Sequence, residues 1–210
     1  MPSFEAGSYL LDIGLIRVGL QERPSMTAQE VSEFAELRST IRQRGTQRLW
    51  VFLVTLVAWA GATIATAALA ALPVATLLPL LLLAGGFEAV FQLHTGVERI
   101  GRYLQVFYDD GEAPQGSRNW ERTAMAYGRA FPGGSDALLT PYFLLATVLN
   151  YVPVLFADPL RIELTVVGAV HLVFIARLLL ARHQAGKQRA LDLERFERIK
   201  QENRTAATPK

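Results

Sequence analysis

The sequence predicts an all-α, polytopic membrane protein whose four transmembrane helices form two tight hairpins. Three observations predict this fold. Four apolar segments are each about 20 residues long, the connections within each pair of segments are very short, and basic residues are concentrated in the remaining regions. A content of 51% hydrophobic and 19% charged residues in 210 residues fits one membrane-embedded unit better than two soluble domains.

The four apolar segments cover residues 49–71, 74–96, 138–157 and 160–181. Each is long enough to cross the hydrocarbon core of a bilayer as a helix, which takes about 20 residues. The first and third segments contain no charged residue, and the second contains only Glu88. The fourth contains Arg161, Glu163 and Arg177. Pro73 and the sequence ADP at 157–159 are the only breaks within the two pairs, so each pair is predicted to form a tight hairpin.

The basic residues predict the orientation of these hairpins. Six lie before residue 49, five lie in the connection 97–137, and eight lie in the tail 182–210, whereas the hairpin tips contain only Arg161. Because cytoplasmic loops carry the excess of lysine and arginine, residues 1–48, the connection and the tail are predicted to be cytoplasmic. The membrane domain then covers residues 49–181 of a multi-pass protein of the cytoplasmic (inner) membrane. The N-terminal stretch lacks the basic region of a signal peptide, and we expect it to remain in the mature protein.

The predicted cytoplasmic regions contain amphipathic helical patterns. Thr27 and Glu30 have the spacing of a capping box, which predicts a helix start. An apolar stripe follows at helical spacing, formed by Val31, Phe34, Leu37 and Ile41. A second stripe lies on a charged helix in the tail, formed by Leu193, Phe196 and Ile199. These stripes are candidate partner-binding surfaces. Alternatively, the first stripe packs against the chain's own cytoplasmic connection or lies on the membrane surface. For the second stripe, the alternative is a solvated charged helix.

The connection between the hairpins is predicted to begin as a continuation of the second membrane helix. The first clear stop signal is the sequence DDGEAPQGS at 109–117. A short amphipathic helix is predicted over 118–131, and Asp136 is a candidate cap for the third membrane helix.

Composition and motifs exclude several classes of function. The chain has no cysteine, which excludes disulfides, thiolate metal sites and cysteine nucleophiles. A net charge of +2 does not indicate a nucleic-acid-binding surface. No phosphate-binding loop, serine-hydrolase elbow or zinc-protease motif is present, so an enzyme is not the favoured class. No cofactor or metal site is predicted, although His94, His171 and His183 leave a b-type haem or a metal as an alternative.

Polar residues in and beside the second and fourth segments are the remaining candidates for a site. Glu88, Gln92, Thr95 and Arg99 share one helical face, which is an alternative indication of a channel or transporter. Residues that lie at the cytoplasmic end of the same helix are His94, Glu98, Arg99 and Arg102. From the helix rise, Glu88 matches both His171 and Arg177 in depth, and Arg177 is the predicted partner because a permanent cation gains most from a carboxylate. We expect His171 to donate a hydrogen bond to a neighbouring backbone carbonyl.

The function that these features favour is that of a non-enzymatic integral membrane protein. It would act as a subunit or scaffold of a larger membrane complex, with its interaction surfaces on the cytoplasmic side. Its expected partners are the lipid bilayer and other membrane or cytoplasmic protein subunits, or further copies of itself. A row of small residues at i,i+4 spacing on the first span predicts close helix contact, either within the monomer or at an interface with another chain, along Ala58, Ala62, Thr66 and Ala70.

Overall fold

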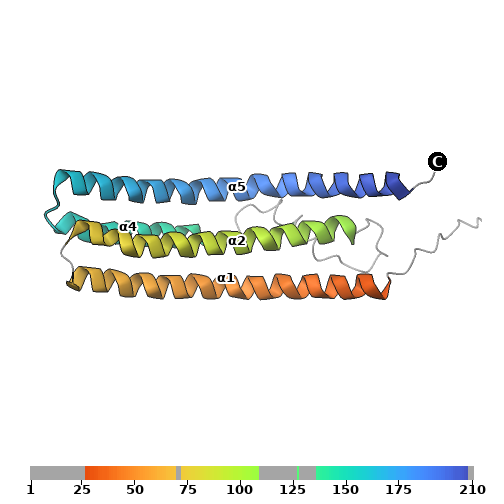
Figure 1. Ribbon diagram of the computed structural model, residues 1–210, viewed down its shortest axis with the longest axis horizontal. Coiled ribbons are helices and arrows are strands. Elements are labelled where there is room, and N and C mark those ends of the chain that lie inside the picture. Colours follow the sequence, from red (N-terminus) through yellow and green to blue (C-terminus); the bar gives the residue numbers. More distant parts are fainter. Residues whose placement is uncertain (1–26, 70–71, 109–126, 128–135, 208–210) are drawn as a thin grey trace, which may run out of the picture.

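The computed structural model describes residues 27–69, 72–108, 127 and 136–207, and the described chain is helical throughout its regular structure. The elements are α1 (Ala28–Leu69), the 3₁₀ helix η1 (Pro73–Thr76), α2 (Leu77–Phe107), α4 (Thr140–Phe156) and α5 (Arg161–Ala207) (Figure 1). The predicted all-α class is confirmed for this part of the chain. The segment 118–131, for which a short helix was predicted, lies outside the described residues apart from Tyr127.

Three of the helices are long and apolar enough to cross a membrane, as judged by length and composition. They are α1, the combined η1 and α2, and α5. The third predicted span, residues 138–157, is shorter than expected, because α4 contains 17 residues. Leu139 has a left-handed backbone with φ of 55°, which prevents an earlier helix start. At the other end, Asp158 has φ of 47° and precedes Pro159, so the helix cannot continue.

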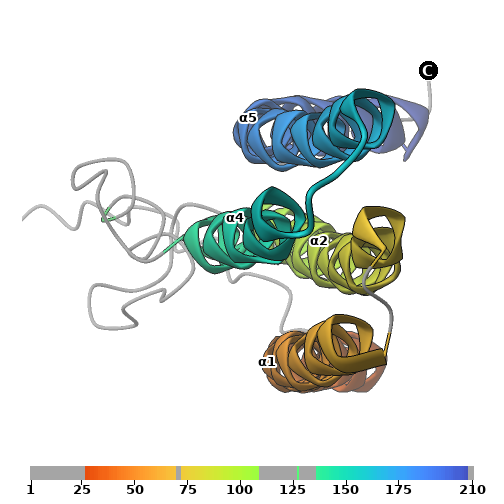
Figure 2. The ribbon, with the colours of Figure 1, turned by 90° about the vertical axis from the view of Figure 1, so that its left-hand side faces the viewer.

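The helices run beside one another, with α2 between α1 and α5 and α4 next to α2 (Figure 2). Within the described residues, α1 and α5 have no Cα atoms within 8 Å of each other, so they lie on opposite sides of α2. Both short connections lie at one end of the molecule, and the three long helices extend past α4 toward the other end (Figure 1). We call residues 28–48 of α1, 97–107 of α2 and 182–207 of α5 the charged extension.

The apolar core is built around phenylalanine side chains, one from each helix. The Phe87 ring of α2 meets Phe143 of α4 edge to face at a centroid distance of 5.3 Å and Phe174 of α5 at 6.2 Å. Phe52 of α1 meets Phe143 at 5.6 Å. Edge-to-face contacts at these distances stabilise aromatic pairs beyond the burial of their area. All four rings are buried, so the core fixes the four helices relative to one another.

At Gly86, α1 and α2 pack closely together. A Cβ atom at Gly86 would lie 2.6 Å from the Cβ of Thr55, so only glycine permits this approach. Within the small-residue row, Ala62 and Thr66 are half-buried and Ala58 is exposed, and Ala70 lies outside the described residues. Contact of Ala58 with a helix of another chain stays a prediction.

The predicted helix start at Thr27 is confirmed by its hydrogen bonds. The backbone N–H of Thr27 donates to Glu30 Oε2 at 2.7 Å, and the N–H of Glu30 donates to Thr27 Oγ1 at 3.2 Å, which is the reciprocal pattern of a capping box. The predicted cap at Asp136 is wrong. Its carboxylate accepts a hydrogen bond from the N–H of Leu138 at 3.0 Å, in a turn that precedes α4 and leaves the helix without a side-chain cap.

Candidate functional site

Glu88 and Arg177 form an ion pair between α2 and α5. Arg177 Nε lies 2.7 Å from Glu88 Oε1, and Arg177 Nη2 donates to Glu88 Oε2 at 2.8 Å, so the contact is bidentate. The guanidinium also lies over the ring of Phe91, 5.0 Å from its centroid. The structure therefore places Glu88 against its predicted partner, with an aromatic face beside the cation. About 42% of the Glu88 side chain and 33% of the Arg177 side chain are exposed, so the pair lies at the edge of the helix bundle.

Asn150 of α4 is the centre of a buried polar network. Its Nδ2 donates to the carbonyl oxygen of Thr76 at 2.9 Å and lies 3.0 Å from Nε2 of His171. Its Oδ1 accepts a hydrogen bond from Trp59 Nε1 at 3.1 Å and a longer one from the Thr63 hydroxyl at 3.4 Å. The amide group of Asn150 is fully buried, and all its hydrogen-bonding capacity is used. One side chain thus joins α1, η1, α4 and α5.

Asn150 was not among the site residues predicted from the sequence. The available signal was its position as a lone amide in the otherwise apolar segment 138–157, where an unsatisfied polar group would be costly.

The hydrogen bonds of His171 define its tautomer. Nδ1 lies 2.8 Å from the carbonyl oxygen of Val167, which can only accept, so Nδ1 carries the proton. Nε2 is therefore the acceptor for Asn150, and the predicted donation from His171 to a backbone carbonyl is found. Tyr151 packs edge to face against the imidazole at 5.1 Å. Both ring nitrogens are engaged, so binding of a haem iron or a metal by His171 would require one of these bonds to break.

The other histidines do not share a site with His171. His94 is buried, and its Nδ1 lies 3.2 Å from Arg48 Nη1 of α1, so Nδ1 accepts from the guanidinium. Glu98, predicted on the same face, binds Arg102 Nη2 at 2.8 Å and Arg189 Nε at 3.1 Å. His183 is exposed on α5. The described residues contain no group of three histidine, aspartate or glutamate side chains that could hold a metal ion.

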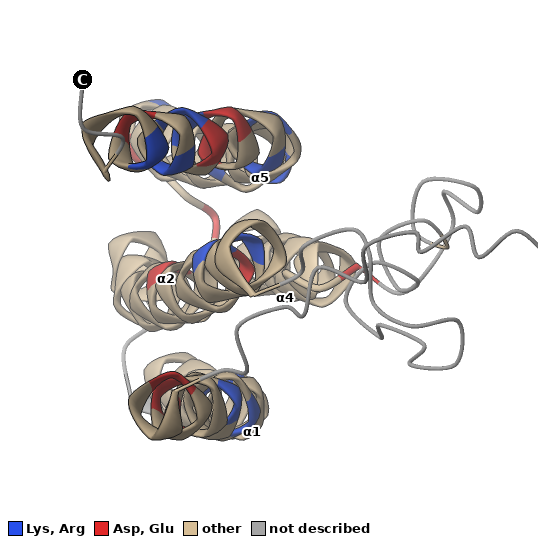
Figure 3. Ribbon diagram, turned by 90° about the vertical axis from the view of Figure 1, so that its right-hand side faces the viewer, with Lys and Arg blue, Asp and Glu red and all other residues tan. Residues whose placement is uncertain are grey.

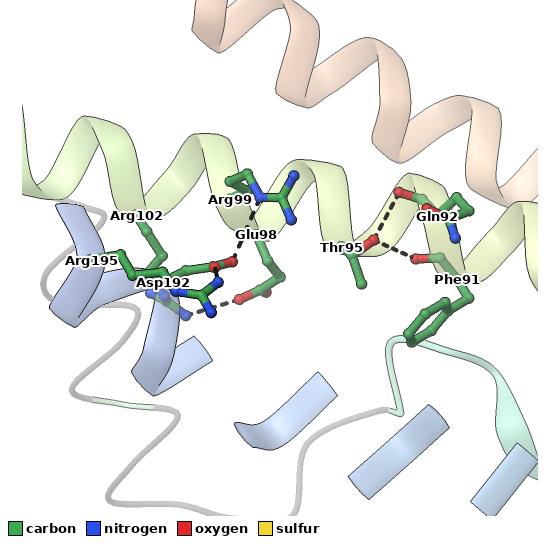
Figure 4. Close-up of polar contacts among 8 residues, drawn as sticks. All are labelled: Phe91, Gln92, Thr95, Glu98, Arg99, Arg102, Asp192 and Arg195. Carbon is green, nitrogen blue, oxygen red and sulfur yellow. Dashed lines mark hydrogen bonds and ion pairs between the residues drawn. The ribbon is translucent and has the colours of Figure 1, made fainter. Parts of the chain in front are cut away.

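The predicted polar stripe of α2 is divided among different contacts (Figure 4). The Thr95 hydroxyl donates to its own helix, at 3.1 Å from the carbonyl oxygens of Phe91 and Gln92. Gln92 is exposed, and Arg99 Nε lies 3.7 Å from Asp192 of α5. Asp192 is buried and also lies 3.7 Å from Arg195 Nη1.

An aromatic cluster joins the three helices of the charged extension. Phe34 of α1 meets Tyr108 at the end of α2 at 5.5 Å, and Phe196 of α5 meets Tyr103 at 5.8 Å and Phe107 at 6.4 Å. Two of the predicted partner-binding residues therefore pack on the chain itself. The other stripe residues differ: Leu37, Ile41 and Leu193 are half-buried, whereas Val31 and Ile199 are 53% and 44% exposed.

Glu33 adds a polar contact to this aromatic cluster. The Tyr103 hydroxyl donates to Glu33 Oε1 at 2.9 Å. Burial, together with the nearby Glu33 carboxylate, raises the pKa of Tyr108 to about 12 and also raises the pKa of Tyr103. Both phenols thus stay protonated at neutral pH, and Tyr103 keeps its hydrogen bond to Glu33.

Charged residues lie on all three long helices at the end that carries the charged extension (Figure 3). Acidic and basic side chains are both present there, and they form ion pairs both between and within helices. Two cavities lie at the level of the apolar segments. One of about 250 Å³ lies between α4 and α5 beside His171 and Tyr151, and one of about 290 Å³ lies near η1 and the end of α4.

No protein-family model matches this chain, and no similar protein was found among curated sequences or among solved structures. The proposal of a function therefore rests on the contacts described above.

Proposed function

We propose that this chain is a non-enzymatic, polytopic membrane protein that acts as a subunit or scaffold of a larger membrane complex. In this proposal, α1, α2, α4 and α5 each cross the cytoplasmic (inner) membrane, as two hairpins. The N-terminus, the C-terminus and the connection between α2 and α4 are cytoplasmic. The arrangement of the helices supports this topology, because both hairpin tips lie at one end and the charged extension lies at the other (Figure 1).

The length of α4 is compatible with a fourth span. Its 17 residues give a helix about 26 Å long, close to the hydrocarbon thickness of about 30 Å. Its inward face is buried at Phe143, Thr147, Asn150 and Val154, and Leu149 and Leu155 on other faces are exposed apolar residues. An exposed apolar surface of this kind is stable against lipid or against another membrane helix.

The long helices continue without a break from the apolar segments into the charged extension, and this continuity is the main support for a scaffold. The part of α5 from residue 182 to 207 is about 39 Å long and continues the membrane segment without a break. The aromatic cluster and the Arg189–Glu98 pair fix it against α2. A projection that is anchored in a membrane and held rigid by its own contacts suits a protein that positions other subunits.

The polar groups of the apolar segments favour a structural role over transport or redox chemistry. Glu88 and Arg177 neutralise each other, and Asn150 and His171 satisfy each other's hydrogen bonds. Such pairs lock helices together when the geometry is good, whereas conduction requires polar groups that remain available to an ion. The channel and the haem or metal hypotheses therefore have less support than the scaffold.

The exposed positions of the apolar stripes give a test of the proposal. The double substitution Val31→Glu and Ile199→Glu adds charge to the exposed apolar positions of the charged extension without removing a core contact. We expect it to release components that co-purify with the wild-type protein from native membranes at fixed stoichiometry. Quantitative mass spectrometry of the purified complex, after purification in mild detergent, measures this release.

A matched control adds the same charge to other exposed positions of the same helices. Gln43→Glu and Ala190→Glu lie outside the two stripes, and we expect this variant to retain every component. Retention of all components by both variants would show that the stripes are not partner surfaces. A wild-type protein that purifies from membranes alone, with no component at fixed stoichiometry, would contradict the scaffold proposal itself.

A further inference from the structure

Two arginines, one helical turn apart on α1, turn toward α2 without meeting a carboxylate. Arg48 Nη1 lies 3.2 Å from His94 Nδ1, and the Nε atom of Arg48 is buried with no hydrogen-bond partner. Arg44 packs on Gly96, where an added Cβ would lie 2.5 Å from Arg44 Nη1. Both arginines are half-buried, and neither forms an ion pair with an acidic residue of the described chain. The face of α1 that is turned toward α2 therefore carries two cations that form no ion pair with an acidic residue of the described chain.

Three arginines on the neighbouring helices do have acidic partners. Glu98 binds both Arg102 and Arg189, and Arg182 lies 3.8 Å from Asp136. The His94 side chain, which faces Arg48, is neutral in the tautomer that accepts from a guanidinium, so it adds no anion. Within the described residues, Arg44 and Arg48 thus lack the acidic partners that Arg102, Arg189 and Arg182 have.

The sequence around these arginines places them at a membrane boundary. The apolar segment of α1 begins at residue 49, and the exposed side chains of Leu49, Trp50 and Leu53 follow directly, with Trp50 at 64% exposure. Tryptophan is enriched at the boundary between hydrocarbon and headgroups. Arg48 then lies at this boundary, and Arg44 lies about 6 Å further out, within the headgroup layer of roughly 5 to 8 Å on each side of the bilayer.

We propose that Arg44 and Arg48 form a binding site for the phosphate of an anionic phospholipid headgroup, in the leaflet where α1 enters the membrane. This site rests on the proposed membrane placement of α1 and does not depend on protein partners. A guanidinium presents paired N–H donors that match phosphate oxygens, and two guanidinium groups one turn apart can bind one phosphate together. His94 is a positioning residue, because it accepts from one arm of Arg48 and so directs the rest of the guanidinium. The buried Nε of Arg48 has no acceptor among the described residues. A local rearrangement on lipid binding would give this N–H group an acceptor.

Native mass spectrometry of the full chain, released from detergent, tests the site with defined lipids. Phosphatidylglycerol, phosphatidylcholine and inorganic phosphate are added in separate titrations. We expect the wild-type protein to bind phosphatidylglycerol more tightly than phosphatidylcholine. The variant Arg44→Gln/Arg48→Gln should lose about tenfold or more in affinity for phosphatidylglycerol, since each juxtamembrane cation contributes about 1 kcal/mol to binding of anionic lipid. The variant Arg44→Lys/Arg48→Lys keeps the charge but not the paired N–H donors. We expect its loss of affinity for phosphatidylglycerol to be smaller.

The control Arg42→Gln/Lys187→Gln removes two exposed cations from the same region and changes the net charge equally. Its affinity for phosphatidylglycerol should fall by less than threefold. Circular dichroism and a thermal melt check that each variant is folded. If the glutamine variant is not folded, the lysine variant is compared with the wild type instead.

An equal loss of affinity for phosphatidylglycerol in the glutamine variant and in the control would overturn the site, because the change in net charge alone would explain the loss. Displacement of the lipid by equimolar inorganic phosphate would also overturn it, since the ligand would be free phosphate. Loss of co-purifying subunits without loss of lipid affinity would affect only the scaffold proposal.

Discussion

At the scale of single residues, Asn150 connects α4 to three other elements through one amide group. Replacing it with leucine removes the acceptor of Trp59 and the donor to His171 while all of these groups remain buried or half-buried. We expect Asn150→Leu to lower the free energy of unfolding by about 2 to 4 kcal/mol, because unpaired buried polar groups keep their desolvation cost. Thermal unfolding in detergent measures this change.

The neighbouring Leu149 provides the control for Asn150, since its side chain is 48% exposed and Leu149→Val should change stability by less than 1 kcal/mol. Equal stability of Asn150→Leu and the wild type would show that the network contributes nothing to the fold.

The Glu88–Arg177 pair makes a second prediction at this scale. Glu88→Gln and Arg177→Gln should each lower the melting temperature in detergent, because each leaves the other charge without its bidentate partner. The double variant should lose less than the sum of the single variants, with a coupling energy of roughly 1 kcal/mol. A double-mutant cycle on melting curves gives this value. Additive losses would mean that the two residues do not stabilise each other.

The residue-level predictions from sequence succeeded where charge stood out against an apolar background. Glu88 and Arg177 were conspicuous for this reason, and the helix rise was enough to match their depths. Asn150 was missed because its partners depend on how α4 is rotated and on the carbonyl oxygen that η1 presents, and neither follows from spacing. The unpaired state of Arg44 and Arg48 likewise depends on which helix faces them.

At the scale of elements, two adjacent glycines of α2 provide a matched test of helix packing. Gly86 faces Thr55 of α1 at a distance that leaves no room for a methyl group, whereas a Cβ at Gly85 would meet nothing within 4 Å. Gly86→Ala should therefore destabilise the protein by about 1 to 3 kcal/mol through overpacking. Gly85→Ala should be neutral or stabilising by up to about 1 kcal/mol, because alanine is the better helix former. Equal effects of the two substitutions on the melting temperature would contradict the close approach of α1 and α2.

The packing of the charged extension should depend on pH through its tyrosines. A phenol whose pKa is raised in the folded state contributes stability that is present below its unfolded pKa of about 10 and is lost as the pH rises through the folded value. For Tyr108, with a pKa of about 12, this loss falls between about pH 10 and pH 12. Ultraviolet titration of tyrosinate should show this late step in the wild type but not in Tyr108→Phe. Glu33→Gln should shift the step to lower pH, and a titration of Glu33→Gln that matches the wild type would exclude the carboxylate as a cause.

The elements themselves were predictable to different degrees. The helix start at Thr27 and the continuation of α2 to Phe107 followed from a capping box and from the absence of a stop signal before residue 109. The shorter α4 was not predictable, because Leu139 adopts a left-handed conformation that leucine disfavours and that no sequence signal marks. Small residues permit close contact but do not say with which helix, so the exposed Ala58 leaves contact with another chain as a prediction.

At the scale of the whole molecule, the order of the helices lay beyond the sequence. Hydropathy and loop length predicted two hairpins, but they contain no information on which helix occupies the centre. The structure gives α2 that place, with Phe87 contacting α4 and α5 and Gly86 contacting α1. This arrangement makes α2 the helix to which both outer helices are fixed, along the apolar segments and along the charged extension.

We propose that the chain crosses the membrane four times, with the hairpin tips outside and the charged extension in the cytoplasm. The chain contains no cysteine, so single cysteines introduced at Ser39, Asp158 and Thr205 report their location without background. All three positions are exposed, which makes them accessible to a reagent on their own side of the membrane. Labelling with a membrane-impermeant maleimide in intact cells tests this topology. Labelling after permeabilisation confirms that each cysteine is reactive. The cysteine at residue 158 should be labelled in intact cells, and those at residues 39 and 205 only after permeabilisation. Labelling of residue 39 or 205 in intact cells, or protection of residue 158, would contradict the proposed topology.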